Sequence, residues 1–483
     1  MKPVSITKVG PTILEGVNMS VKVRSSGETM QLADFFSKLT YNDIPESSRR
    51  AIRHFVLDTV ACALHGRKTE WAGIVEKWAR DNGSGNKQAT VWGDNGPSLR
   101  ASDAALLNGT AAHAFELDDY HPVKHHPGAV VIPAALAVGE KLGSSGEEIV
   151  TAIAAGYELM IRTSYAMDPA PTMLRGWHIT GITGAFGSAA AAAKLLNLNV
   201  EETAWAYGIA GTQSSGLFAW LYDGAMTKRF HAGDAARAGI VASELAGFGY
   251  TGSKAIFEFE NGGFLKAHSD HAVPAKLVED LGKTWMLEGT SFKPYSCCGS
   301  THAYVDAAKI LRNRYGNLVE SNDGRKVRMG LPHLLTVQCG FDYEPGTILN
   351  GQMSMRYCVT AGFRYGNALP NEFTPEKLSD AKNVAFAQAI EIEHDPELDN
   401  IYPANFCGWV EVETGIGTNQ YDREYLLNAS GSCHNPDKEK AMAAKFHSLL
   451  EDIVPEEQRT KVEKCVLNIE NSPANELIKE FHL

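Results

Sequence analysis

The sequence predicts a mainly α-helical protein in which a smaller α+β unit is inserted towards the C-terminal end. Up to about residue 282, Ala- and Gly-rich segments carry apolar residues at helical spacing, without a convincing series of alternating strands. After about Thr290, the segments 334–339 and 408–414 alternate apolar and polar residues as half-buried strands do. A chain of 483 residues is also too long for one typical hydrophobic core, so more than one domain is expected.

The first part of the chain contains a succession of expected helices. Gly66 is a plausible stop for the second of them, and Ser145 with Glu148 resembles a capping box ahead of another. Small residues let such helices approach closely, which favours a large all-α domain. The helices are expected around 32–39, 52–64, 104–114, 149–157, 189–196, 200–207 and 235–245.

The later part of the chain mixes both kinds of element. Helices are expected at 303–311 and 378–390, between and before the two strands, and helical spacing returns at 441–450 and 461–467. If these closing helices return to the first domain, the α+β unit is an insertion. The expected division is a flexible lead-in at 1–30, a helical domain at 31–289, an α+β domain at 290–432 and the rest of the helical domain at 433–483.

Composition restricts the class of protein. The net charge of −12 argues against nucleic acid or an anionic membrane surface as the main partner, and no apolar run is long enough to predict a membrane span. Eight cysteines in so long a chain do not resemble a disulfide framework. The first thirty residues lack a secretory signal and carry Glu15 and Glu28, so a cytoplasmic location is favoured over a mitochondrial one.

The polar stretch from Glu116 to Gly128 is the first candidate for a functional site. Three carboxylates and three imidazoles fall within eleven residues, between apolar segments. One interpretation is a catalytic loop in which Pro127 and Gly128 place His126 at the start of a helix, as an acid or base. The alternatives are a solvated loop whose acids cap helices, and a metal site built from Asp118, His121, His125 and His126.

Two Gly- and Ala-rich segments carry further candidates. His178 precedes a Gly-rich lead into a helix, which suits either anion binding by backbone N–H groups or a buried core histidine. Lys228, Arg229 and His231 form a small cationic group suited to a carboxylate or phosphate, although such a group taken alone is usually a surface feature.

Two segments of the α+β unit also carry candidate site residues. Lys293 lies at the expected domain junction, and Cys298 is either a nucleophile or, more commonly for cysteine, a structural residue. Arg356 and Tyr357 follow later. Tyr357 suits hydrogen bonding to a developing oxyanion or, from this segment alone, simple core packing.

These five segments, in this order, resemble the MmgE/PrpD family, which includes 2-methylcitrate dehydratase, cis-aconitate decarboxylase and iminodisuccinate epimerase. The likeness runs from about Met30 to the C-terminal helices. It implies a helical domain built from both ends of the chain, an inserted α+β lid, a homodimer, and no metal or organic cofactor.

The resemblance also implies a set of site residues. It places His126, His178, Lys228, Lys293 and Tyr357 in a cleft between the domains, with Glu116 where many relatives have Asp. Cys298 stands where the animal decarboxylase has a histidine. Further candidates for substrate contact are Tyr120, His231, Cys298 and Arg356.

The expected function is therefore that of a cofactor-independent lyase acting on a small di- or tricarboxylate. The form Glu-Leu-Asp-Asp-Tyr-His at 116–121 looks most like fungal cis-aconitate decarboxylases, and the short spacer before His126 departs from true 2-methylcitrate dehydratases. Dehydration of an alkylcitrate and epimerisation at an acidic C–H remain alternatives, since all three reactions can share an enolate-like intermediate. A hypothesis from another class is a metal-binding or non-catalytic protein that uses Asp118, His121 and His125.

Overall fold

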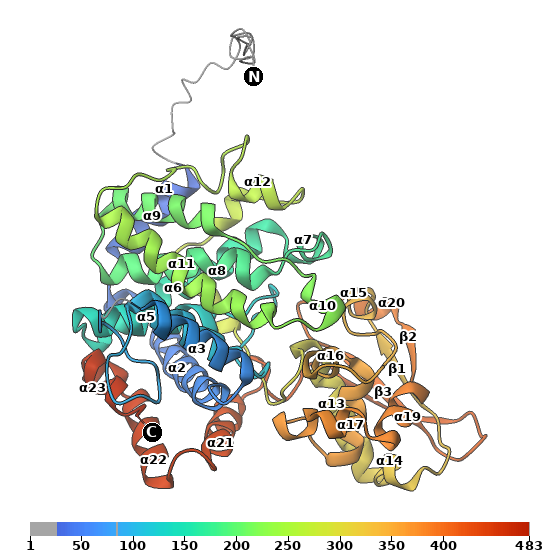
Figure 1. Ribbon diagram of the computed structural model, residues 1–483. Coiled ribbons are helices and arrows are strands. Elements are labelled where there is room, and N and C mark those ends of the chain that lie inside the picture. Colours follow the sequence, from blue (N-terminus) through green and yellow to red (C-terminus); the bar gives the residue numbers. More distant parts are fainter. Residues whose placement is uncertain (1–26, 84–85, 483) are drawn as a thin grey trace, which may run out of the picture.

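The computed structural model describes residues 27–83 and 86–482, and shows a mainly helical protein with one small sheet (Figure 1). Most of the expected lead-in at 1–30 lies outside the described residues. The first helix, α1, begins at Glu28, slightly before the expected boundary at 31.

The predicted helices before residue 282 are confirmed, and most are longer than their apolar stripes indicated. Ser145 and Glu148 form the expected capping box of α6. The helices are α1 (Glu28–Lys38), α2 (Glu46–Gly66), α3 (Glu70–Asn82), α4 (Ala101–Ala112), α5 (Gly128–Leu142), α6 (Gly146–Met167), α7 (Pro169–Leu174), α8 (Ile179–Leu195), α9 (Val200–Gln213), α10 (Trp220–Asp223), α11 (Thr227–Gly247) and α12 (Phe264–His268).

Helix α8 corrects one expectation, because the Gly-rich lead after His178 is itself helical and α8 begins at Ile179. Glycine is unfavourable inside a helix, yet here it permits close packing: a Cβ on Gly184 would lie 2.8 Å from the Cβ of Ala235 in α11. Likewise Lys228, Arg229 and His231 lie in the first turns of α11 rather than ahead of it.

The later part of the chain contains a four-stranded sheet in the order β2-β1-β3-β4. Strand β1 (Val327–Leu331) pairs parallel with β2 (Glu391–His394) and antiparallel with β3 (Gly408–Glu413), which pairs antiparallel with β4 (Tyr421–Leu426). The helices here are α13 (His302–Tyr315), α14 (Leu318–Ser321), α15 (His333–Gln338), α16 (Ile348–Met353), α17 (Met355–Tyr365), α18 (Pro375–Leu378), α19 (Ala381–Ala389) and α20 (Pro396–Asp399).

The predicted strand at 408–414 is confirmed as β3, but the one predicted at 334–339 is wrong, because this segment forms α15. Its buried residues are Leu335 and Cys339, four apart as on one helix face, whereas Val337 is exposed. The expected helix at 378–390 is confirmed as the shorter α19, because Leu378 ends the separate helix α18.

The closing helices pack against the first ones, with α21 and α22 against α2, and α23 against α5 (Figure 1). They are α21 (Lys438–Leu450), α22 (Glu456–Val466) and α23 (Ala474–Lys479). One large hydrophobic cluster accordingly joins residues between 32 and 292 with residues between 442 and 481, and a second, centred on the sheet, draws mostly on residues 298–412.

Short 3-10 turns complete the architecture, at Tyr41–Asp43, Pro274–Leu277, Met286–Gly289, Gly299–Thr301, Pro370–Phe373 and Ile469–Asn471. Within the described ranges, no helix combines the length and the apolar character needed to cross a membrane.

Candidate active site

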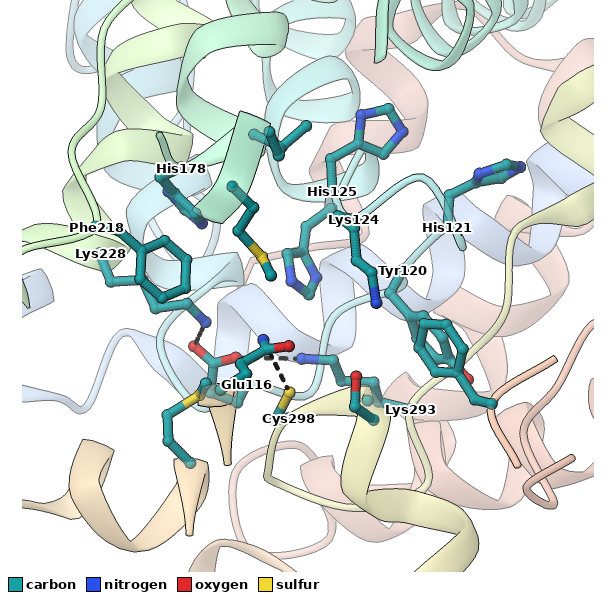
Figure 2. Close-up of a pocket in the computed structure, with 18 of the residues that line it drawn as sticks. Glu116, Tyr120, His121, Lys124, His125, His178, Phe218, Lys228, Lys293 and Cys298 are labelled. Carbon is teal, nitrogen blue, oxygen red and sulfur yellow. Dashed lines mark hydrogen bonds and ion pairs between the residues drawn. The ribbon is translucent and has the colours of Figure 1, made fainter. Parts of the chain in front are cut away.

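A polar pocket lies where side chains of the two hydrophobic clusters meet (Figure 2). It collects residues from the loop between α4 and α5, from the starts of α8 and α11, and from the later part of the chain. Its lining comprises Glu116, Tyr120, His121, Lys124, His125, His126, Met173, His178, Ile179, Phe218, Trp220, Lys228, Lys293, Cys298, Gly299, Ser300, Gln338, Met353 and Phe406.

The loop between α4 and α5 is fixed from within the protein by Asp119. One carboxylate oxygen of Asp119 accepts a hydrogen bond from the Gly128 N–H at 2.8 Å, at the start of α5, and the other accepts from the Tyr157 hydroxyl at 2.7 Å. A carboxylate is favourable at a helix N-terminus, where backbone N–H groups lack partners. Asp119 is therefore a structural anchor of the loop, and it is absent from the pocket lining.

Glu116 links two of the three lysines that line the pocket. It adopts a positive φ of 57°, which is uncommon outside glycine, and its carboxylate forms ion pairs with Lys228 and with Lys293, the latter at 3.2 Å. Burial alone would raise the pKa of Glu116, but the two ammonium groups hold it well below its usual range. Lys293 retains its proton, because Glu116 raises its pKa despite burial.

His126 is held in one orientation with a defined tautomer. Its Nδ1 lies 2.8 Å from the carbonyl oxygen of Asp119, and a carbonyl can only accept, so Nδ1 carries the proton. The other ring nitrogen, Nε2, is then the basic one. Burial, followed by the proximity of Lys293, holds the pKa of His126 well below its ordinary value, so the ring is neutral near pH 7.

His113 is a neighbour of this site that sequence reasoning missed. Its Nδ1 lies 2.8 Å from an Asp118 carboxylate oxygen, and its ring centre lies 4.7 Å from that of His126. Ligand-capable atoms of His113, Asp118 and His126 fall within 4.8 Å of one another. Its position at the C-terminal end of α4, three residues before Glu116, was the available signal.

The expected metal set of Asp118, His121 and His125 is not brought together as a ligand group in the described part of the chain. His121 donates from Nε2 to the Met286 carbonyl oxygen at 3.2 Å, and Nδ1 of His125 lies 3.3 Å from the Thr183 hydroxyl. Both histidines still line the pocket, and burial lowers their pKa values, that of His121 to about 4.

His178 and His231 form a pair, with their Nδ1 atoms 3.0 Å apart. One of the two nitrogens must donate and the other accept, so at least one ring is neutral at that nitrogen. Burial, with His231 next, holds the pKa of His178 well below its ordinary value. Of the pair, only His178 lines the pocket.

Cys298 presents its thiol to the pocket. A hydrogen bond with the Cys339 thiol lowers the pKa of Cys298 to about 6, with help from Lys293 and against the effect of burial. Gln338 donates from Nε2 to the Cys298 sulfur at 3.7 Å. The thiolate is thus the favoured form near neutral pH.

Tyr120 and Lys124 form another wall. The Tyr120 ring stacks on that of Phe406 at 5.1 Å, and the Lys124 amine lies 3.9 Å from the centre of the Tyr402 ring. Burial lowers the pKa of Lys124 to about 7. Lys124 was missed from the sequence, although its place within the polar stretch was a signal.

Tyr357 and Arg356 lie elsewhere. The Tyr357 hydroxyl donates to the Glu372 carbonyl oxygen at 2.6 Å, and its ring packs in a third hydrophobic cluster. Arg356 pairs with Asp342 at 3.2 Å and donates to the carbonyl of Ile390. Neither residue lines the pocket, so the cleft that the resemblance implied is built without them.

An apolar wall completes the pocket and was also missed. Trp220 packs at 5.6 Å from the His178 ring and 5.4 Å from the Lys228 amine. The other apolar members are Met173, Ile179, Phe218 and Met353. Nothing in their sequence distinguishes them from ordinary core residues.

Comparison with known proteins shows which family the chain resembles. The chain matches the MmgE/PrpD N-terminal domain over residues 30–276 and the MmgE/PrpD C-terminal domain over residues 295–471. It is 30% identical to a cis-aconitate decarboxylase-like protein, oryM, of Aspergillus oryzae over 92% of this chain and 95% of the relative.

Several relatives are themselves named cis-aconitate decarboxylase. That of Aspergillus terreus is 29% identical over 94% of this chain and 96% of its own, and that of Homo sapiens is 26% identical over 87% of each. Both matched domains together span most of the sequence. The chain belongs to the MmgE/PrpD family.

Proposed function

We propose that this protein is a lyase that decarboxylates cis-aconitate to itaconate. The observation that carries the proposal is the set of charged residues that line the pocket. The lining contains three lysines, Lys124, Lys228 and Lys293, and one carboxylate residue, Glu116. This cationic excess lies inside a chain whose net charge is −12. Such a site suits a small polyanion, and the names of the relatives indicate which one.

The reaction needs electrostatic stabilisation of the negative charge that remains when CO₂ leaves. The bond between the methylene carbon and its carboxylate breaks and releases CO₂, and its electron pair forms a new double bond to the central carbon. The pair of the former double bond moves to the far alkene carbon, where the enolate-like charge is delocalised onto the carboxylate attached to that carbon. Lys228 and Lys293, oriented by Glu116, are in position to stabilise that charge in a site largely shielded from water.

The proton that completes the reaction is assigned to His126. The trianion and one proton give the itaconate dianion and CO₂, with the proton added at the far alkene carbon. Negative charge arriving beside His126 raises its pKa, so that Nε2 takes up a proton which it then delivers. The hydrogen bond from Nδ1 of His126 to the Asp119 carbonyl leaves Nε2 directed at the pocket.

The proposal also includes a lid domain and a homodimer. We expect residues 290–432 to act as a lid, because Lys293, Cys298 and Ser300 line the pocket opposite residues of the first cluster. Closure would exclude water once the substrate is bound. The homodimer that the resemblance implies also remains a prediction, which the mass of the protein in solution tests.

A substrate panel tests the proposal. The purified protein is incubated separately with cis-aconitate, 2-methylcitrate and iminodisuccinate, while CO₂, enoate absorbance and optical rotation are followed. The expected result is CO₂ release from cis-aconitate, and turnover of only one of the other two substrates would assign dehydration or epimerisation instead.

Metal analysis of the same preparation addresses the rival class. The residues to consider are His113, Asp118 and His126, whose ligand-capable atoms lie close together. Full activity after chelation is expected, because the proposed steps use only side chains. Stoichiometric metal with activity abolished by chelators would overturn the cofactor-independent mechanism.

A further inference from the structure

We infer that Lys124, together with Tyr402 and Ser300, forms a separate carboxylate subsite that lets the pocket prefer tricarboxylates over dicarboxylates. The inference rests on the proposed function, since it assigns a place for one carboxylate of that substrate. Its central observation is that Lys124 lines the pocket and forms no ion pair with a carboxylate of the described residues.

The lysines of the site differ in how their charge is balanced. Lys228 and Lys293 share Glu116, and the nearby Lys445 pairs with Asp58 at 2.6 Å. Within residues 27–83 and 86–482, no carboxylate forms an ion pair with Lys124. Burial lowers the pKa of Lys124 to about 7, so a bound carboxylate would favour its ammonium form and relieve the cost of burying that charge.

The surroundings of Lys124 provide hydrogen-bond donors for such an anion. The Lys124 amine hydrogen-bonds the Tyr402 hydroxyl, which lies 2.9 Å from the Ser300 hydroxyl. Lys124 and Ser300 both line the pocket, and the amine points into it (Figure 2). One of the two hydroxyls donates to the other, which leaves the ammonium group and one hydroxyl to donate to the two oxygens of a carboxylate.

The backbone of Lys124 adopts an unfavourable conformation at this position. Its φ is 70°, a left-handed conformation that is uncommon for a residue with a long side chain. The turn is closed by hydrogen bonds from the Lys124 N–H to the His121 carbonyl and from the His121 N–H to the His125 carbonyl, both 3.0 Å. Strain maintained in this way is typical of functional positions.

Aromatic rings fix the direction of the side chain. The amine lies 3.9 Å from the centre of the Tyr402 ring and 4.9 Å from that of Phe406. These contacts hold the amine in the pocket and do not neutralise it as a carboxylate would. The subsite is thus preformed and separate from the two lysines that Glu116 bridges.

The test compares two competitive inhibitors, propane-1,2,3-tricarboxylate and glutarate, which lacks the central carboxylate. The wild-type protein is expected to bind the tricarboxylate more tightly. Lys124→Met should weaken tricarboxylate binding by about 10- to 100-fold, the effect of one charged hydrogen bond, and leave glutarate binding unchanged. Lys124→Arg should retain most of the preference, and Tyr402→Phe should lose part of it.

Unchanged glutarate binding also shows that Lys124→Met is folded, and Lys254→Met, at an exposed lysine paired with Glu201, serves as the matched control. The inference is overturned if Lys124→Met binds the tricarboxylate as well as wild type does, or if both inhibitors weaken equally. Failure of the wild-type protein to bind either inhibitor, or to turn over cis-aconitate, would instead refute the proposed function.

Discussion

At the scale of single residues, Cys298 is the side chain whose chemistry depends most on its neighbours. The thiol lies in the pocket beside Lys293, and its hydrogen bond with Cys339 favours the thiolate. An ordinary cysteine has a pKa of about 8.5 and is mostly protonated at pH 7. Cys298 is therefore expected to be the thiol of the pocket that reacts with electrophiles.

We predict that alkylation of Cys298 by iodoacetamide rises with pH through a midpoint near its pKa of about 6 and reaches a plateau by pH 8. The sign follows from the lowered pKa, because the reactive thiolate is present above it and lost as the pH falls. Mass spectrometry measures the rate, with Cys298→Ser as the control. A rate still rising at pH 8 would contradict the assignment.

A second residue-scale prediction concerns His126. His126→Gln should reduce kcat by about 100- to 10,000-fold, the usual contribution of a general acid or base, while the protein remains folded. The matched control is His333→Gln, at an exposed histidine outside the pocket. Loss of the folded state in His126→Gln, or an unchanged kcat, would contradict the role given to this side chain.

Most of the site could be predicted from residue type and order, but not all of it. Glu116, His126, Lys228 and Lys293 carry charge or a titratable ring in the segments that the family resemblance connects, and the pocket brings them together. Tyr357 had no comparable feature in the sequence, because a tyrosine is as common in a hydrophobic core as in a binding site. The apolar wall could not be found, because its function depends on distant partners, and the place of Lys124 in the polar stretch did not by itself distinguish it from a solvated lysine.

At the scale of elements, the junction between α2 and α21 contacts the loop between α4 and α5. Asp58 of α2 and Lys445 of α21 form a buried ion pair at 2.6 Å, and Lys445 also hydrogen-bonds the Leu117 carbonyl next to Glu116. A C-terminal helix is in this way tied directly to the site. The buried charges are tolerated because each has a partner.

Removal of one partner of the Asp58–Lys445 ion pair should lower the stability of the protein. We predict that Lys445→Met lowers the free energy of unfolding by about 3–5 kcal/mol, because Asp58 is left as an uncompensated buried charge. The double variant Asp58→Asn, Lys445→Met should recover most of that loss. Denaturant unfolding measures all three proteins, and additive losses in the double variant would contradict the coupling.

Element boundaries were less predictable than element types. The apolar stripe located α11 only from residue 235, yet the helix begins at Thr227, because its first turn is polar and faces the pocket. The alternation at 334–339 indicated a strand, but Pro332 precedes a helix that buries Leu335 and Cys339. Over six residues, an alternating pattern does not exclude a helix, and tertiary contacts decide.

At the scale of the whole molecule, the pocket connects the two hydrophobic clusters. Lys228 belongs to α11 of the first part, whereas Lys293 and Ser300 introduce the later part. A polyanion held by both would join the parts and bind the folded state alone. Ligand at 100 times its Kd would then stabilise the protein by about 2.7 kcal/mol.

We therefore predict that cis-aconitate or its unreactive tricarboxylate analogue raises Tm, as followed by calorimetry. Lys228→Met should lose most of this rise, because one of the two anchoring parts no longer holds the ligand. The exposed Lys77→Met is the matched control. An equal rise in both variants would indicate binding away from the pocket.

The most direct measurement is the product analysis of cis-aconitate incubated with the purified protein in D₂O, by NMR. The predicted result is itaconate and CO₂ in equal amounts, with one solvent deuterium on the former alkene carbon, and a reaction at least 100-fold slower in His126→Gln. Absence of itaconate, or an unaffected rate in His126→Gln, would contradict decarboxylation with protonation by His126.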